Sequence, residues 1–241
     1  MTIKLVKFGN LQIEVKEPWE EEYLETSRCR IQKTLEIISV KPNDKVLEIG
    51  CDSGLFSLIF KGKFQSVDYQ AVEVSPERMK TAVARGIKVT AVDIDKEKLP
   101  FADNSFDLVL LTEVIEHLSN PLLILSEIRR VVKPAGNVIV STPNSVGLFA
   151  RYNHLIGVAP HNPVFLDDIN SRKGKYGAHR FELTISQCKE LLEKNGYKIE
   201  QTAFSRFNHQ RRGLIVKIIE RLSLLKPTRS DMMIFKCRVA K

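Results

Sequence analysis

The sequence predicts an α/β protein built on a doubly wound, mainly parallel sheet, and three observations support this fold class. Short apolar runs alternate with helical patterns along most of the chain, as in repeated βαβ units. The run from Phe106 to Leu111 has the apolar character of a strand buried on both faces. A glycine-containing turn, residues 50–54, follows the first strand of this pattern. Doubly wound folds bind ligands at such a turn.

The expected elements follow one another in a regular order. After Ser75, which is the expected N-cap of a helix, Pro76 occupies the first helical position and Glu77 the first turn. Lys133–Gly136 and Gly196 each close a helix. Helices are expected over residues 20–39, 122–132 and 186–195, and from residues 55 and 76 onward. Strands are expected over residues 45–49, 70–74, 88–92, 106–111, 137–141, 197–203 and 232–239.

We expect residues 1–241 to form a single domain with three additions. Residues 1–40 form an N-terminal extension with a short hairpin and a helix. Residues 144–183 lack clear periodicity and are interpreted as an insertion that caps the acceptor site at one end of the sheet. Residues 205–230 form a basic amphipathic decoration, in which an apolar stripe alternates with Lys and Arg.

The net positive charge of the chain is concentrated in its last 37 residues. Residues 205–241 contain ten Lys or Arg and two acidic residues, so this segment carries the whole net charge of +8. Such a segment suggests an anionic membrane surface or RNA as a partner, or simply a helix packed on its own domain. There is no apolar run of the roughly 18 residues that a transmembrane segment needs, and no signal-peptide pattern. The four cysteines are scattered, so we expect reduced thiols and a cytoplasmic protein.

The turn at residues 50–54 discriminates between cofactors. A dinucleotide site expects G-x-G-x-x-G, but Asp52 and Leu55 stand at the second and third glycine positions. A pyrophosphate would therefore face a carboxylate. The pattern Glu48-x-Gly50-x-x-x-Gly54 instead suits a cofactor without a phosphate at this point, although a glycine turn with no ligand remains an alternative.

Two further acids end neighbouring strands. Glu73 ends the second strand, 19 residues after Gly54, where a carboxylate can accept hydrogen bonds from both hydroxyls of a ribose. Asp93 ends the third strand, where it can accept a hydrogen bond from an adenine amino group. Each acid alone fits a solvated strand end, but in order they converge on one edge of the sheet and indicate a nucleoside site.

These segments resemble a known family. Val46–Gly54 resembles the first motif of class I S-adenosylmethionine-dependent methyltransferases, and Ala71–Pro76 resembles the second. The segments Leu99–Asp107, Glu113–Leu118, Arg130–Gly136 and Ser141–Asn144 continue the family pattern in the same order. The resemblance spans about residues 45–203. It implies a Rossmann-like sheet of seven strands whose last strand is antiparallel, and it favours the small-molecule O-methyltransferase-like branch.

The resemblance implies that S-adenosyl-L-methionine is the cofactor and assigns its binding residues. Glu73 would bind the ribose, Val74 would pack on the adenine, and Asp93 with Ile94 would recognise the adenine edge. Thr112 would border the methionine part. The complete implied set is Glu48, Gly50, Cys51, Asp52, Gly54, Glu73, Val74, Asp93, Ile94 and Thr112.

One residue departs from the family pattern. Asp52 replaces the usual central glycine of the first motif. Asp tolerates the left-handed backbone conformation better than most residues do. We therefore expect Asp52 to keep the turn intact, and its charge could pair with the amino group or sulfonium of the cofactor. The alternative is an altered cofactor pocket.

His117 is the candidate catalytic residue. Methyl transfer needs a base only if the acceptor loses a proton as it attacks. His117 follows the fourth strand, near the expected methyl group, and an imidazole titrates in the right range. The alternative is that His117 only shapes the loop.

A metal is a further alternative. On a helical turn, Glu113, Glu116 and His117 would share one face, and His179 could supply a fourth ligand. This resembles the metal site of small-RNA 3′-terminal 2′-O-methyltransferases. That family has a second histidine where Leu118 stands here, so we assign no metal ligand.

The sequence therefore predicts a methyltransferase acting on an oxygen of a small molecule or of a lipid-linked intermediate. Two rival interpretations stay open. One is a metal-dependent RNA 2′-O-methyltransferase, and the other is a methyltransferase-like module that binds a partner without catalysis.

Overall fold

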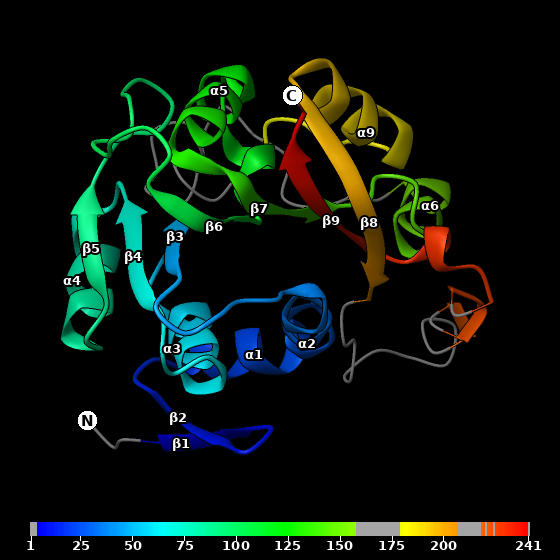
Figure 1. Cartoon of the computed structure of the whole chain (residues 1–241). Coiled ribbons are helices and arrows are strands. Elements are labelled where there is room, and N and C mark those ends of the chain that lie inside the picture. Colours follow the sequence, from blue (N-terminus) through cyan, green and yellow to red (C-terminus); the bar gives the residue numbers. More distant parts are fainter. Residues whose placement is uncertain (1–3, 158–178, 207–217, 220, 224, 241) are drawn as a thin grey trace.

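Seven strands form one sheet in the spatial order β5-β4-β3-β6-β7-β9-β8. The computed structural model describes residues 4–157, 179–206, 218–219, 221–223 and 225–240 (Figure 1). The strands of the sheet are β3 (Lys45–Ile49), β4 (Asp68–Glu73), β5 (Lys88–Ala91), β6 (Phe106–Thr112), β7 (Val132–Pro143), β8 (Tyr197–Ser205) and β9 (Met232–Val239). The sheet confirms the predicted fold class.

The direction of the strands creates a crevice in the middle of the sheet. Strands β3 to β7 pair in parallel, whereas β9 is antiparallel to both of its neighbours, β7 and β8. The chain runs outward from β3 through β4 to β5 and then returns to the other side of β3 as β6. The carboxyl ends of β3 and β6 therefore flank the switch point at which doubly wound folds bind ligands. The predicted antiparallel last strand is confirmed.

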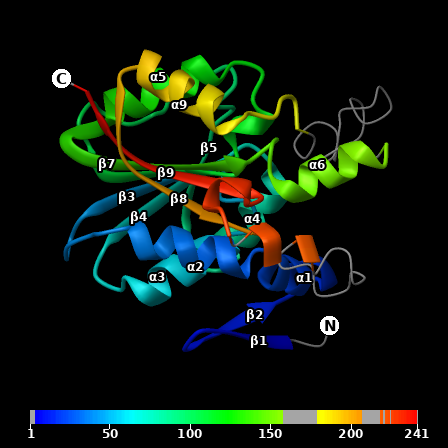
Figure 2. The ribbon, with the colours of Figure 1, turned by 90° about the vertical axis from the view of Figure 1, so that its right-hand side faces the viewer.

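Helices cover both faces of the sheet (Figure 2). One face carries α1 (Pro18–Thr26), α2 (Arg28–Ile37), α3 (Leu55–Lys63) and α4 (Pro76–Ala84), and the other carries α5 (Pro121–Val131) and α9 (Ile185–Lys194). In β6, Leu108 and Leu110 pack into the core beneath the first group of helices. Val109 and Leu111 pack into the core beneath α5 and α9. Burial on both faces explains the apolar character of this strand.

The N-terminal extension differs from its prediction in one respect. The expected hairpin is present as β1 (Lys4–Phe8) and β2 (Leu11–Val15), which pair antiparallel. The expected single helix over residues 20–39 is wrong, because α1 and α2 are separate helices that meet at Ser27. The Thr26 hydroxyl donates a hydrogen bond to the carbonyl of Glu22 at 2.8 Å. A side chain bonded back to the helix backbone in this way commonly bends a helix.

Two predicted additions are described only in part. In the segment 144–183, α6 (Leu148–Leu155) precedes residues 158–178, which lie outside the described residues. Half of the basic decoration at 205–230, including residues 207–217, also lies outside them, so the membrane or RNA contact expected there stays a prediction. A 3-10 helix, Pro227–Arg229, leads into β9. Among the helices of the described chain, none combines the length and apolar character that a membrane crossing requires.

Substitution of Gly54 tests how tightly α3 and α4 pack at the turn after β3. It adopts a positive φ of 82°, and a Cβ atom there would lie 3.2 Å from Cβ of Ala82 in α4. We expect Gly54→Ala to lower the free energy of unfolding by about 2–3 kcal/mol, because backbone strain and overpacking add. Equilibrium urea unfolding measures this loss.

Gly86 is the matched control. Its φ is 75°, but an added Cβ would meet no described atom within 4 Å. Gly86→Ala should therefore show only the backbone strain, about 1 kcal/mol. Equal losses in the two variants would mean that the contact with α4 is not tight.

Candidate active site

The turn after β3 is left-handed at three of its five positions. Gly50, Asp52 and Gly54 have φ values of 72°, 50° and 82°. A Cβ atom on Gly50 would lie only 2.7 Å from Cγ2 of Val114, so a side chain at this position would force Val114 to move. Asp52 adopts the left-handed conformation that we expected it to tolerate.

Glu73, at the end of β4, is fixed by backbone hydrogen bonds. Its Oε2 accepts from the amide of Asp52 at 2.8 Å, and its Oε1 accepts from the amides of Val74 and Ser75, each at 2.9 Å. The side chain is buried beside the turn. The carboxylate is therefore oriented before any ligand arrives, and the remaining lone pair of Oε2 can still accept a hydrogen bond.

A cavity of about 760 Å³ opens at the carboxyl ends of these strands. Polar residues from three successive strand ends, Glu73, Asp93 and His117, line it together with apolar Val74 and Ile94. Gly50 and Asp52 also border it. The structure thus brings together seven of the predicted site residues, from segments that are well separated in the chain.

A smaller cavity of about 350 Å³ adjoins the first. It shares Gly50, Asp52 and His117 with the larger one and adds the predicted residues Glu48, Cys51 and Thr112. Gly54 is not among the described residues that line either cavity. It is the N-cap residue of α3, and its Cα lies close to Ala82 of α4. Its predicted contact with the cofactor stays a prediction.

The charges around the turn are partly paired. The Asp52 carboxylate forms an ion pair with Arg78 of α4 and also accepts a hydrogen bond from the amide of Ser53. Asp93 accepts from Lys96 Nζ at 2.7 Å. These contacts leave the cavity acidic overall, because Glu73 and Glu113 also face it. An acidic cavity suits a ligand that carries positive charge.

Glu48 lies beneath the turn and is almost fully buried. Its Oε2 accepts hydrogen bonds from the hydroxyls of Ser57 and of Tyr69, the latter at 2.7 Å. Burial raises the pKa of Glu48 to about 7, although these two hydrogen bonds oppose the shift. Glu48 therefore supports the turn from below as well as lining the smaller cavity.

The loop after β6 departs from the predicted helical turn. Only Ile115–His117 form a 3-10 helix, and Glu113 precedes it with a φ of 57°. The expectation that Glu113, Glu116 and His117 share one helical face is therefore wrong. The Glu113 carboxylate instead accepts a hydrogen bond from the Ser141 hydroxyl at 2.9 Å, and it lies 3.9 Å from Nε of Arg30.

Two side chains of this loop, Glu116 and His117, lie close to His179, and together the three could hold a metal ion. Ligand atoms of Glu116, His117 and His179 all lie within 4.8 Å of one another. The rings of the two histidines pack edge to face with centroids 4.9 Å apart. Burial and the neighbouring charge of Glu113 raise the pKa of Glu116 well above its usual range. One carboxylate and two imidazoles form a donor set that suits a divalent transition metal.

The N-terminal helices supply site residues that sequence reasoning missed. Trp19 and Tyr23 of α1 and Arg30 of α2 line the smaller cavity. Arg30 is buried, and its Nη2 donates a hydrogen bond to the hydroxyl of Tyr23 at 2.9 Å. Within the described part of the chain, Nε of Arg30 has no hydrogen-bond partner. Tyr23 belongs to α1 and Arg30 to α2, so no spacing within one helix could have indicated that the two side chains meet.

Comparison with known proteins agrees with this geometry. Residues 47–140 match the family model of a methyltransferase domain. An uncharacterized protein of Methanocaldococcus jannaschii is 37% identical over 99 residues, which cover 41% of this chain and 44% of that protein. The demethylmenaquinone methyltransferase of Bacillus cereus is 28% identical over 130 residues, covering 50% of this chain and 55% of that enzyme. The chain thus matches about half the length of these curated relatives.

The fold has solved counterparts. A crystal structure of a SAM-dependent methyltransferase from Thermotoga maritima, described as a possible histamine N-methyltransferase, superposes with a TM-score of 0.64 at 18% identity. The superposition covers 92% of this chain and 95% of that one. Together, the domain match, the strand order and the left-handed turn define a class I methyltransferase domain. The domain match covers residues 47–140, and the chain has the fold of solved S-adenosylmethionine-dependent methyltransferases.

The raised pKa of Glu48 predicts a pH-dependent stability. Between pH 4.5, the ordinary pKa, and pH 7, the folded protein keeps a proton that the unfolded chain has lost. The free energy of unfolding should therefore fall as the pH rises through this window, by on the order of 3 kcal/mol. Glu48→Gln removes the titration, so its stability relative to the wild type should increase from pH 4.5 to 7. Urea unfolding at several pH values checks this, and parallel pH profiles would contradict it.

Proposed function

We propose that this chain transfers a methyl group from S-adenosylmethionine to an oxygen atom of a small molecule or of a lipid-linked intermediate. One observation carries the proposal: a single cavity at the switch point of the sheet is lined by Glu73, Asp93 and His117, which follow three different strands. The first two suit a nucleoside, and the third suits proton transfer.

The residues present fit the cofactor. The fixed Glu73 carboxylate offers the free lone pair of Oε2 to a ribose hydroxyl, and the close approach of Val114 to Gly50 disfavours a side chain in the turn. Val74, Ile94 and Leu118 supply apolar walls for a base, and Asp93 supplies an acceptor for its amino group. The acidic lining of the cavity is complementary to a sulfonium and an ammonium group.

Arg30 carries the positive charge that suits the carboxylate of the cofactor. The buried guanidinium lines the smaller cavity, next to the turn. Its Nε lies 3.9 Å from Glu113 Oε2 but has no hydrogen-bond partner among the described residues. A buried donor without a partner is costly unless a ligand satisfies it. We assign this donor to the carboxylate of the methionine part of the cofactor.

The chemistry required of the protein is modest. When bound, S-adenosylmethionine supplies an activated methyl group. His117, which lines both cavities, takes the proton that an acceptor hydroxyl loses as its oxygen attacks. The walls formed by Trp19 and Tyr23 align the acceptor and exclude water, which lowers the barrier through proximity. The relative named for demethylmenaquinone supports a lipid-linked acceptor.

A second candidate is metal-assisted transfer to a ribose hydroxyl of RNA. The convergence of Glu116, His117 and His179 favours it. In that case His117 would be a ligand and not the base. A third interpretation, a binding module without catalysis, predicts that S-adenosylhomocysteine binds but that no methyl group is transferred, or that the cofactor does not bind at all.

The cofactor site predicts two loss-of-binding variants. We expect Glu73→Gln and Asp93→Asn each to weaken S-adenosylhomocysteine binding by roughly 10- to 100-fold, because each removes a charged hydrogen-bond acceptor. Isothermal titration calorimetry measures the dissociation constants. Asp103→Asn is the control, since Asp103 pairs with Arg130 on the surface, outside the residues that line either cavity. Unchanged affinity in both test variants would refute the assigned adenosine position.

His117 and the metal can be separated in one assay. Transfer of a tritiated methyl group from S-adenosylmethionine would be measured with hydroxylated small molecules, lipid extracts and single-stranded RNA as acceptors. If His117 is the base, His117→Gln should lower kcat by about 100-fold or more with unchanged cofactor affinity, and EDTA should have no effect. Activity that EDTA abolishes, and that Mn²⁺ or Zn²⁺ restores, would favour the metal-assisted mechanism. Full activity of His117→Gln would exclude both roles.

A further inference from the structure

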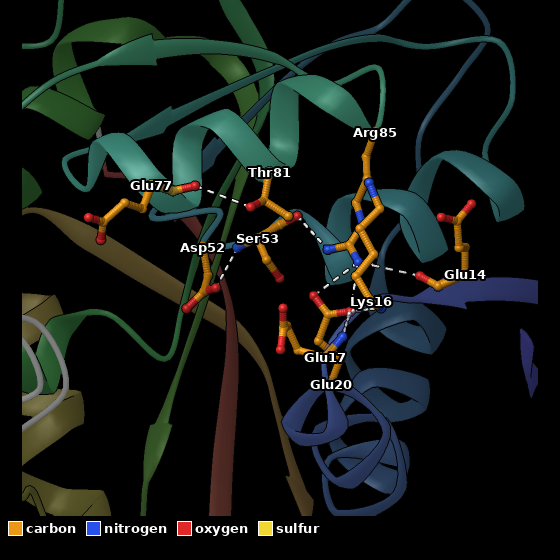
Figure 3. A network of polar contacts seen from close by, with 9 residues as sticks. All are labelled: Glu14, Lys16, Glu17, Glu20, Asp52, Ser53, Glu77, Thr81 and Arg85. Carbon is orange, nitrogen blue, oxygen red and sulfur yellow. Dashed lines mark hydrogen bonds and ion pairs between the residues drawn. The ribbon is translucent and has the colours of Figure 1, made fainter. Parts of the chain in front are cut away.

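A buried ion pair joins the N-terminal extension to the methyltransferase core. Arg85, the C-cap residue of α4, donates to both carboxylate oxygens of Glu20 in α1, at 2.9 and 2.8 Å (Figure 3). The two side chains are only 4% and 1% exposed. The pair uses no residue to which the proposed chemistry gives a role.

Arg85 contacts three separate segments. Besides Glu20, it donates to the carbonyl oxygen of Ser53 at 2.8 Å and to that of Glu14 at 3.3 Å. Glu20 in turn accepts from the amide of Lys16 at 2.7 Å. Figure 3 shows these groups converging between α4, the end of β2 and the start of α1. One guanidinium therefore links the hairpin, α1 and the turn that follows β3.

The hydrogen bond from Arg85 to the Ser53 carbonyl connects the ion pair to the turn at the proposed cofactor site. Ser53 follows Asp52, whose amide is held by Glu73, so Arg85 binds the same five-residue turn that borders the proposed cofactor site. A buried ion pair is often no more stabilising than an apolar pair of the same volume. An apolar pair, however, could not donate hydrogen bonds to Ser53 and Glu14. The ion pair thus provides a directional link that packing alone would not.

Helix α1 connects the Arg85–Glu20 ion pair to the wall of the smaller cavity, on the acceptor side of the site. We define the N-terminal cap as residues 4–26, which comprise the hairpin and α1. Its Trp19 lies next to Glu20 in sequence, and Trp19 and Tyr23 line the smaller cavity. A shift of α1 relative to the turn would therefore move a wall of that cavity.

We propose that Arg85 and Glu20 are positioning residues that couple docking of the N-terminal cap to the conformation of the cofactor turn. A ligand that fixes residues 50–54 fixes the Ser53 carbonyl, and through Arg85 and Glu20 it holds the cap in place. Coupling of this kind is reciprocal, so a docked cap also strengthens cofactor binding. The inference rests on the proposed cofactor site.

Hydrogen exchange of the full chain with and without S-adenosylhomocysteine tests the coupling. In the wild type, we expect the ligand to slow exchange in residues 4–26 as well as in residues 50–54 and 73–75. In Arg85→Lys, which keeps the charge but cannot reach all three segments, the ligand should still protect residues 50–54 and 73–75. Its protection of residues 4–26 should fall by about fivefold or more, and its dissociation constant should rise by a similar factor.

A matched control lies on the same cap. Lys4 and Glu21 form an exposed ion pair between the hairpin and α1, and Lys4→Gln should leave the ligand-induced protection unchanged. Glu20→Gln provides a second test variant should Arg85→Lys fold poorly, which circular dichroism would reveal. A purely structural role would speed exchange of residues 4–26 equally with and without ligand. The protection ratio, and not the exchange rate itself, is therefore the deciding quantity.

The outcomes separate this inference from the proposed function. If S-adenosylhomocysteine does not bind the wild type, the proposed function fails, and this inference fails with it. If the ligand binds and protects residues 50–54 but never residues 4–26, only the coupling is overturned. The coupling is likewise overturned if the ligand protects residues 4–26 equally in the wild type, Arg85→Lys and Glu20→Gln.

Discussion

The left-handed turn between β3 and α3 is the constraint on which the site depends. Gly50 must lack a side chain because Val114, from the loop after β6, occupies that space. The amide of Asp52 points to Glu73 at the end of β4. One five-residue turn therefore sets the relative position of three neighbouring strand ends. The crevice, the oriented carboxylate and the loop bearing His117 all follow from this arrangement.

Much of the fold and part of the site were predictable because they depend on local patterns. Strand β6 is apolar because it is buried on both faces, and this composition is visible without any tertiary information. Glu73 and Asp93 could be placed together because parallel strands end at the same edge of a sheet. The left-handed conformation at Asp52 followed from the family position of a glycine and from the tolerance of Asp for that region.

The remaining features depend on packing between distant segments. Arg30 lies in the site only because α2 packs beside the sheet, and nothing in its neighbouring residues indicates burial of a guanidinium. Glu113 was expected on a helix, but its positive φ, which few residues adopt, turns the chain before Ile115. Gly54 packs closely against Ala82 of α4, a contact between two helices that its position in the motif does not indicate. A one-dimensional pattern records none of these contacts.

The segment after β7 leaves and rejoins the core at nearly the same point. Asn144 and Leu183 form a parallel bridge, and the amide of Ser145 donates to the carbonyl of Leu183 at 3.1 Å. The buried Asn144 is also bonded to Ser230 and Asp231, just before β9. Because the two ends are fastened side by side, the intervening stretch can change in length or composition at little entropic cost and without disturbing the sheet. A change in the length of the segment between these two anchors would therefore leave the register of β7 and β9 unchanged.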